Sequence, residues 1–165
     1  MAAVGTAAGI ATGSVYTHFA DKTQLVTAIF RTVVNRELDA VNAAVARTGD
    51  PVEKVTGVVE TFAGRALKNP NLAYALLAEP VDPAVDAERI VFRRKFGATI
   101  ARAVSDGVAS GDITPQDADL TAAALVGAIG EVLVGPLASD PHSERVIPDL
   151  VAFTLRSIGI SRAHT

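Results

Sequence analysis

The chain has 165 residues, of which 49% are hydrophobic and 20% charged, and its formal net charge is −3. This composition predicts one domain, or one domain with a small appendage, and excludes a disordered tail or a collagen-like repeat. The sequence contains no cysteine, which excludes disulfides, thiolate zinc sites and a thiol nucleophile and fits a cytoplasmic location. The weakly acidic charge alone argues against a nucleic-acid-binding protein.

The chain begins with a predicted short helix that has one apolar side. Met1, Val4 and Ala8 are spaced as a single stripe on a helical surface. Gly9 follows, and glycine best tolerates a tight turn between two helices. Ile10 is predicted to plug this turn.

A second short helix is predicted from Gly13 to Phe19, with Thr12 as its cap. Val15 and Phe19 are four residues apart and would face the core. The remaining face carries hydroxyls and an imidazole, which can donate hydrogen bonds to phosphates or base edges. These side chains belong to Ser14, Tyr16, Thr17 and His18. The first twenty residues nevertheless contain no Asp, Glu, Lys or Arg.

A long amphipathic helix is predicted over residues 22 to 47. Asp21 can cap it, and Gln24 can reach back to complete a capping box. Apolar residues then recur at three- and four-residue steps from Val26 to Val45. Gly49 is expected to end this helix.

Three later helix starts combine a capping residue with a proline in the first turn, at Asp50-Pro51, Asp82-Pro83 and Thr114-Pro115. The first helix is followed by a short one over residues 71 to 78, and the second is long and ends near Gly111. The Gly135-Pro136 pair is expected to end or kink the third. A last helix is predicted to have Pro148 in its first turn and to run to Gly159. The predicted fold class is therefore all-α.

Residues 120 to 138 form an apolar stretch that contains a single charged residue, Glu131. Its length alone would allow it to cross a bilayer. Its alanine and glycine content, Glu131, Pro136 and the lack of an aromatic belt favour instead a helix buried between other helices. We therefore expect no membrane partner.

The stretch AGIATGSVYTHFADKTQL, residues 8 to 25, resembles the helix-turn-helix signature of the TetR family of transcriptional regulators. The resemblance implies a partial helix-turn-helix DNA-binding domain over residues 1–21 and a helical ligand-binding and dimerisation domain over residues 22–165. It implies a ligand-responsive regulator, usually a repressor, that binds operator DNA as a homodimer.

The same resemblance makes residues 13 to 19 the recognition helix. It places Thr17 where it can reach bases, and it implies DNA contacts, mostly to phosphates, for Thr12, Gly13, Ser14, Tyr16, His18 and Lys22. Two alternatives stay open at this point. Lys22 could be a solvated surface residue, and His18 could be a packed or capping histidine.

The DNA-binding domain of the family has three helices, and the two predicted here correspond to its second and third. The resemblance therefore implies a preceding segment with a first helix, and we expect Met1 to be an internal methionine of a longer protein. Basic groups that contact phosphates supply much of the affinity for DNA. We accordingly expect the 165-residue chain to bind operator DNA weakly.

A small-molecule inducer among the middle helices is also implied by the resemblance. Its candidate lining residues, each of which could equally be plain core, are Phe62, Tyr74, Leu77, Phe92 and Phe96. A basic run over residues 89 to 95 is expected to be a solvated face paired with Asp86 and Glu88, or else to hold an acidic ligand. Glu131 is expected either at a hydrogen-bonded rim or facing a ligand. No cofactor and no metal site are predicted.

The last two helices are expected to form the dimer. Small residues at positions 123, 124, 127 and 130 permit close approach of helices, and apolar area is expected from Leu125, Ile129, Val132, Leu133, Val151, Leu155 and Ile158. The two-fold axis would place two recognition helices in successive major grooves of a palindrome.

An enzyme is not predicted. The histidines at positions 18, 142 and 164 are far apart, and the sequence contains no HExxH, phosphate loop, dinucleotide fingerprint or GxSxG motif. The alternative function is a helical ligand-binding and dimerisation module that does not bind DNA.

Overall fold

The computed structural model describes residues 1–139 and 144–160, with the backbone alone described at Thr12 and residues 136–139. Within these ranges every regular element is a helix, which confirms the all-α prediction. The helices are α1 (Ala2–Ala8), α2 (Thr12–His18), α3 (Lys22–Val45), α4 (Pro51–Lys68), α5 (Pro70–Leu77), α6 (Pro83–Ser110), α7 (Ala118–Ser139) and α8 (Val146–Ser157).

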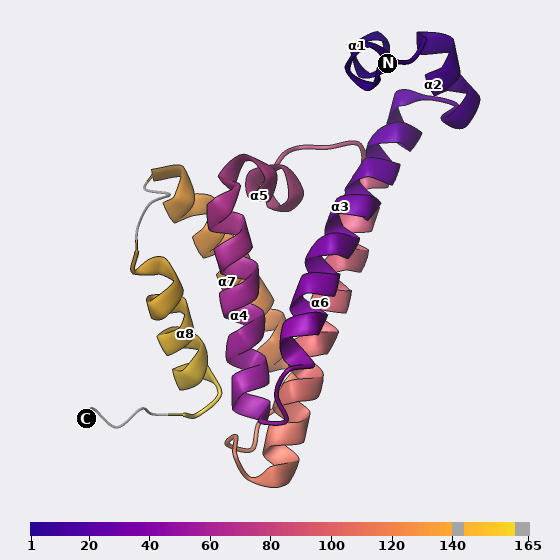
Figure 1. Ribbon diagram of the computed structural model, residues 1–165. Coiled ribbons are helices and arrows are strands. Elements are labelled where there is room, and N and C mark those ends of the chain that lie inside the picture. The colour runs from indigo at the N-terminus through magenta and orange to yellow at the C-terminus, as the bar shows by residue number, and fades with distance from the viewer. Residues whose placement is uncertain (140–143, 161–165) are drawn as a thin grey trace.

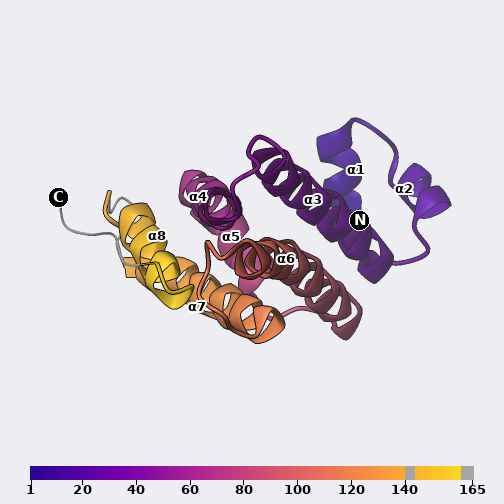
Figure 2. The same cartoon turned by 90° about the horizontal axis from the view of Figure 1, so that it is seen from below.

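The helices from α3 onward form a bundle, and the first two project from it. Figure 2 shows α3 and α4 in one layer and α6 and α7 in the other, with α8 against α4 and α7. The short α5 packs against α4 and α7. Figure 1 shows α1 and α2 beyond the bundle, at the N-terminal end of α3. The long α3 therefore connects the two parts of the molecule.

The core lies between α3, α4, α6, α7 and α8, where Val41, Val55, Ile100, Leu125 and Ile158 are fully buried. At its centre, three phenylalanines form a cluster with ring centroids 4.7 to 6.4 Å apart and tilted planes. Tilted aromatic pairs at these separations are favourable beyond the area that they bury. This cluster joins α4 (Phe62) to α6 (Phe92 and Phe96).

Three of the predicted caps form as the sequence indicates. Asp50 accepts hydrogen bonds from the backbone N–H groups of Val52 (2.7 Å) and Glu53 (3.1 Å), and Asp82 accepts one from Ala84 (2.9 Å). Asp21 accepts one from Gln24 (2.8 Å). The Gln24 side chain accepts from the N–H of Ala20 (3.1 Å), one residue before the position of a standard capping box.

The predicted start of the helix at Thr114 is wrong. Asp117 supplies the cap, accepting from the N–H of Leu120 (2.8 Å), and α7 begins at Ala118. Thr114 instead donates to the carbonyl of Gly159 (3.4 Å). Ile113 is buried against Gly107, and its N–H donates to the Gly107 carbonyl (3.0 Å), so the chain must fold back on α6 before a new helix can begin.

The helix α7 also continues through Pro136 to Ser139. Of the two effects expected of Gly135-Pro136, an end or a kink, the end is therefore wrong. Proline has no N–H and so removes one backbone hydrogen bond from the helix. The packing of α7 against α5 stabilises α7 and can offset the free energy lost with that hydrogen bond. Within the described ranges α7 is the one helix long and apolar enough to cross a membrane. It packs in the bundle on one side, where Leu125, Ile129 and Leu133 are buried, while its Leu120 is 69% exposed.

Candidate DNA-binding surface and effector region

The turn between α1 and α2 is a glycine C-cap. Gly9 has φ 68° and ψ 24°, in the left-handed region where glycine is favoured. The N–H groups of Gly9 and Ile10 donate to the carbonyls of Thr6 (3.2 Å) and Gly5 (2.9 Å), which is the Schellman pattern. In that pattern the residue after the turn frequently packs on a residue five or six positions earlier. Here these are Gly5, which has no side chain, and Val4, which is itself 40% exposed. Ile10 is accordingly exposed and does not plug the turn, contrary to the prediction.

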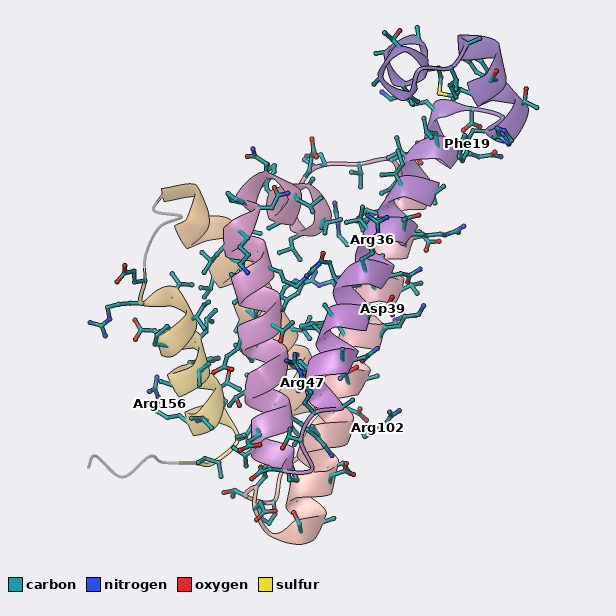
Figure 3. All side chains as sticks on the ribbon, in the orientation of Figure 1. Phe19, Arg36, Asp39, Arg47, Arg102 and Arg156 are labelled. Carbon is teal, nitrogen blue, oxygen red and sulfur yellow. The ribbon has the colours of Figure 1, made fainter. Side chains whose placement is uncertain are left out.

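The second helix begins one residue earlier than predicted. Ala11, in an extended conformation, is its N-cap, and no side chain caps it. Thr12 is the first helical residue, so it is not the cap that the sequence suggested. Val15 is buried as expected, and Phe19 is half-buried at the junction of α2 and α3 (Figure 3).

The polar face of α2 is open to solvent. Gly13, Ser14, Tyr16, Thr17 and His18 are all exposed, and so is Lys22 at the start of α3; the side chain of Thr12 lies outside the described residues. The Thr17 hydroxyl donates to the Gly13 carbonyl (3.1 Å) and keeps its lone pairs available. Tyr16, at 53% exposure, is not a core aromatic. The hydroxyls, the imidazole and the Lys22 ammonium can therefore reach a ligand outside the protein.

Polar contacts tie α3 to the rest of the bundle. On the α6 side, Arg31 donates to Glu88 (2.6 Å), Thr23 to Asp82 (3.3 Å) and Thr99 to Asn42 (3.3 Å). The hydrogen bond from Arg31 and its positive charge hold the pKa of Glu88 below its usual value. Neither partner of this ion pair is deeply buried. Its contribution to stability is therefore small and sensitive to salt.

On the α4 side, α3 is held by a bidentate ion pair. Arg65 donates to both carboxylate oxygens of Glu37, at 2.5 and 2.9 Å. The side chain of Glu37 is only 12% exposed, whereas that of Arg65 is 43% exposed. The hydrogen bonds from Arg65 to Glu37 raise the pKa of Arg65, so the pair stays charged. The fork geometry fixes the spacing of α3 and α4 more strictly than a single contact does.

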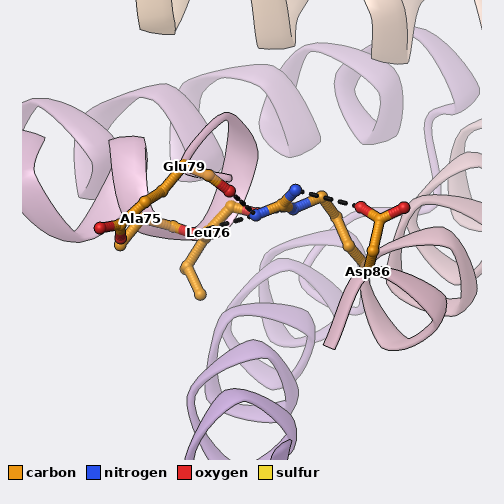
Figure 4. A network of polar contacts seen from close by, with 5 residues as sticks. Ala75, Leu76, Glu79 and Asp86 are labelled. Carbon is orange, nitrogen blue, oxygen red and sulfur yellow. Dashed lines mark hydrogen bonds and ion pairs between the residues drawn. The ribbon is translucent and has the colours of Figure 1, made fainter. Parts of the chain in front are cut away.

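Arg89 holds the end of α5 (Figure 4). Its guanidinium donates to the carbonyls of Leu76 (2.8 Å), Glu79 (2.8 Å) and Ala75 (3.3 Å), and to the carboxylate of Asp86 (3.1 Å). The last carbonyls of a helix lack partners within it and favour a positive charge. Arg89 is therefore largely enclosed, with 11% of its side chain exposed, and is not part of a solvated basic face as predicted. Asp86 pairs with Arg89 as predicted, whereas Glu88 forms its ion pair with Arg31.

The five predicted effector-pocket residues do not line one cavity. Phe62 and Leu77 line a cavity of about 30 Å³ between α3, α4 and α5, below the Glu37–Arg65 pair. Phe92 and Phe96 are buried in the aromatic cluster behind it. Tyr74 lies on the outer face of α5 and is 48% exposed. A cavity of this size is comparable to one water molecule, so an effector would have to displace helices to enter.

Two family models match the chain. Residues 1–29 match the one described as bacterial regulatory proteins, tetR family, and residues 48–133 match the one described as tetracyclin repressor-like, C-terminal domain. The second match alone spans more than half of the chain. The chain belongs to the TetR family. It is thus a transcriptional regulator and not an enzyme, with a DNA-binding N-terminal part and a ligand-binding C-terminal part.

Solved structures of TetR-family regulators have the same fold. The fatty acid degradation regulator FadR from Bacillus halodurans superposes with a TM-score of 0.82 at 17% identity, covering 99% of this chain and 85% of that one. FadR from Bacillus subtilis, in complex with stearoyl-CoA, gives 0.77 at 19%, with 98% and 87% covered. A tetR-family protein from Rhodococcus RHA1 gives 0.74 at 22%, with 96% and 85% covered. None of the curated proteins compared with the chain matches it.

The residues predicted to join two copies of this TetR-family chain mostly belong to its own core. Six of the seven are buried within the bundle, namely Leu125, Ile129, Leu133, Val151, Leu155 and Ile158, and only Val132 is half-buried. Because α7 is apolar around most of its circumference, its sequence does not show which side faces inward. The outward side carries Leu120, Ala123, Ala124 and Glu131, which are exposed.

A groove of about 520 Å³ between α7 and α8 continues this outward face. Glu131, Val132, Val146, Asp149 and Phe153 line it, and Phe153 is 40% exposed. Glu131 therefore lies at the edge of an open apolar groove, which fits either of the two positions expected from the sequence. Exposed aromatic and aliphatic side chains in a contiguous patch are typical of a protein contact surface.

Proposed function

We propose that this TetR-family protein is a cytoplasmic repressor that binds operator DNA as a homodimer and releases it when a small effector binds. Residues 1–21 form the DNA-binding part, and residues 22–165 bind the effector and the second copy. The observation that carries the proposal is the exposed row of hydroxyls and His18 on α2, next to Lys22 and carried on the end of α3.

In this proposal α2 is the recognition helix. Thr17 reads base edges, and Ser14, Tyr16, His18, Lys22, Gly13 and Thr12 contact phosphates. Lys22 and the N–H groups at the start of α3 address the same anion, because a helix N-terminus attracts negative charge. Few cationic side chains lie near this surface, so few of them can contact phosphates. The 165-residue chain therefore binds DNA weakly, and its affinity depends strongly on each phosphate contact that it does make.

The second copy packs on the outward side of α7 and on α8. Ala124, exposed on this side, allows close approach of two helices, and Val132 and Phe153 add apolar area at the groove. This arrangement is an isologous contact between two helices of each copy. It replaces the buried residues that the sequence suggested for the interface.

The effector enters between α3, α4 and α5, where Phe62 and Leu77 line the small cavity under Glu37 and Arg65. The small volume and the bidentate pair indicate a closed state. An effector that binds a wider state more tightly shifts the equilibrium toward it. FadR from Bacillus subtilis is known in complex with stearoyl-CoA, which supports an effector with an apolar part for this fold.

The DNA-binding proposal is tested by salt-dependent gel shifts with a library of palindromic operators. Lys22→Gln is expected to weaken binding to all sequences and to reduce the salt slope by about 1, as for the loss of one phosphate contact. Thr17→Val is expected to relax sequence preference instead. Lys54→Gln, at the distant end of the bundle, is the control. If Lys22→Gln and Lys54→Gln behave alike, α2 and the start of α3 are not the DNA-binding surface.

The dimer proposal is tested by sedimentation. Ala124→Arg places a large charge on the outward face of α7 and is expected to give monomers. Ala109→Arg, at an exposed position of α6, is the matched control and is expected to leave the dimer intact. A chain that sediments as a dimer with Ala124→Arg would show that the copies meet elsewhere. The alternative function, a dimeric ligand-binding module that does not bind DNA, predicts a dimer and no operator shift at any salt concentration.

A further inference from the structure

A second cavity, separate from the proposed effector region, lies between α6 and α7. It is a groove of about 400 Å³, within the range of about 300–1,000 Å³ that small-molecule sites have. None of the residues that line the cavity under Glu37 and Arg65 contributes to it. One helix supplies Ile90, Arg93, Arg94, Gly97 and Ala98, and the other Asp119, Ala122, Ala123, Val126 and Gly127.

The groove exists because both helices present small residues to each other. A Cβ added to Gly97 would lie 3.8 Å from the Val126 side chain, which is ordinary contact, and one added to Gly127 would meet nothing within 4 Å. Side chains larger than alanine at positions 97, 98, 123 and 127 would occupy the space. The walls are thus apolar and narrow, and they suit an aliphatic or flat aromatic body.

The charges of the groove are separated along its length. The guanidinium of Arg93 reaches across to α7 and lies 3.9 Å from where a Cβ on Gly130 would be, and Gly97 lies opposite Val126. Residue numbers therefore rise along α6 as they fall along α7, which means that the two helices are antiparallel. Both arginines are therefore near the Gly130 end. Asp119 lies about 16 Å away along the α7 axis, at a rise of about 1.5 Å per residue. Its carboxylate is too distant to neutralise them.

Arg93 and Arg94 are exposed, and in the part of the chain that the structure describes neither makes an ion pair or a hydrogen bond. This contrasts with Arg31, Arg65 and Arg89, each of which binds a carboxylate. Two adjacent guanidinium groups offer donors whose geometry matches a carboxylate. The arginines thus make the groove electrostatically complementary to an anion at one place, and the small apolar residues of its floor can pack against an apolar chain.

We propose that this groove binds a small amphipathic carboxylate, with its acid group on Arg93 and Arg94 and its apolar body between Gly97, Ala123 and Gly127. Away from the arginines, the lining of α7 runs from Gly127 to Asp119, about 12 Å, which suits an unbranched chain of medium length. The site is distinct from the proposed effector region and does not depend on DNA binding.

The test is calorimetric titration of the 165-residue protein with decanoate below its critical micelle concentration. Decanol and decyltrimethylammonium serve as the uncharged and cationic controls of matched chain length. Decanoate is expected to bind at least about tenfold more tightly than either, since hydrogen bonds to charged groups are worth more than neutral ones. Equal affinity for all three probes would overturn the proposal, because it would show apolar binding without recognition of the acid.

Variants locate the site. Arg93→Gln with Arg94→Gln is expected to weaken decanoate binding about tenfold, whereas Arg102→Gln on the same helix leaves it unchanged. Asp119→Asn is expected to leave binding equal or tighter, because it removes the one carboxylate of the groove. Gly127→Leu is expected to abolish binding by filling the groove without a backbone clash. Decanoate binding that survives Gly127→Leu would place the ligand elsewhere.

The groove adjoins the proposed dimer face at Ala124, because Ala123 and Gly127 are carried by the same helix. Sedimentation of the double arginine variant tells whether the arginines contact a ligand or the second copy. The proposal expects an unchanged sedimentation coefficient together with weakened decanoate binding. A variant that loses the dimer while it retains decanoate affinity would show that the arginines contact the second copy, and would refute the carboxylate site.

Discussion

Arg89→Met should destabilise the protein by detaching α5 from α6. Arg89 supplies three hydrogen bonds to carbonyl groups at the end of α5, of which two are 2.8 Å long, and its side chain is 11% exposed. The Asp86 partner is half-exposed and adds little. Hydrogen bonds to charged groups contribute about 1.5–3 kcal/mol each, and carbonyls near the surface regain part of this from water. We therefore expect the free energy of unfolding to fall by about 2–4 kcal/mol, which is a large part of the total of about 5–15 kcal/mol that is typical of a folded domain.

Urea unfolding followed by circular dichroism measures this loss, with Arg102→Met as the control. Arg102 is an exposed residue of the same helix, and its replacement is expected to change the free energy of unfolding by less than about 0.5 kcal/mol. Hydrogen exchange gives a local measurement, because the N–H groups of Ala78 and Glu79 bond to the Tyr74 carbonyl only while the end of α5 is in place. If both variants unfold at the same urea concentration, Arg89 does not act as the cap of α5.

Two further predictions concern α6. Gly107→Ala would place a Cβ 2.5 and 2.7 Å from side-chain atoms of Ile113 and 3.0 Å from Pro51, so we expect the free energy of unfolding to fall by about 1–3 kcal/mol. Gly57→Ala is the control: its Cβ would meet nothing within 4 Å, and we expect the protein to gain about 0.5–1 kcal/mol of stability. Equal changes in melting temperature for the two variants would contradict this prediction. Arg31 lowers the pKa of Glu88 from its usual 4.5, so the contribution of the pair is present at neutral pH and is lost as the pH falls through the lowered pKa. The difference in melting temperature between the natural protein and Glu88→Gln should therefore shrink to nothing in acid, and a difference that grows below pH 4.5 would be inconsistent with the pair.

Features fixed by local chemistry were predicted from the sequence, and features fixed by distant partners were not. The caps at Asp21, Asp50 and Asp82 depend on N–H groups two or three residues away, so their sequence context suffices. The start of α7 depends instead on Ile113, which is buried against Gly107 of the preceding helix. Thr114-Pro115 and Asp117 are both plausible starts, and only that contact decides between them.

The candidate sites follow the same division. The exposed face of α2 was predicted because Val15 and Phe19 define its inward side by their spacing. The role of Arg89 was missed because its partners are backbone carbonyls, which every residue possesses and no sequence pattern marks. The sequence did not separate the outward face of α7 from its buried face, because a helix that is apolar all round carries no signal of its orientation.

The distribution of contacts along α3 explains how a small change near Glu37 could act on α2. The C-terminal half of α3 is anchored by Val34, Leu38 and Val41, which are buried in the core. In the N-terminal half Leu25 and Phe30 are also buried. The polar contacts of this half with α6, made by Thr23 and Arg31, are exposed and exchange readily with water. From Val41 to Lys22 the helix spans about 28 Å, so a tilt of about 5° around the anchored half would move Lys22 by about 2.5 Å. Hydrogen bonds to DNA tolerate only a few tenths of an ångström. If α2 is the recognition helix of a dimer, as we propose, such a tilt in each copy would break the match between the two helices and their half-sites.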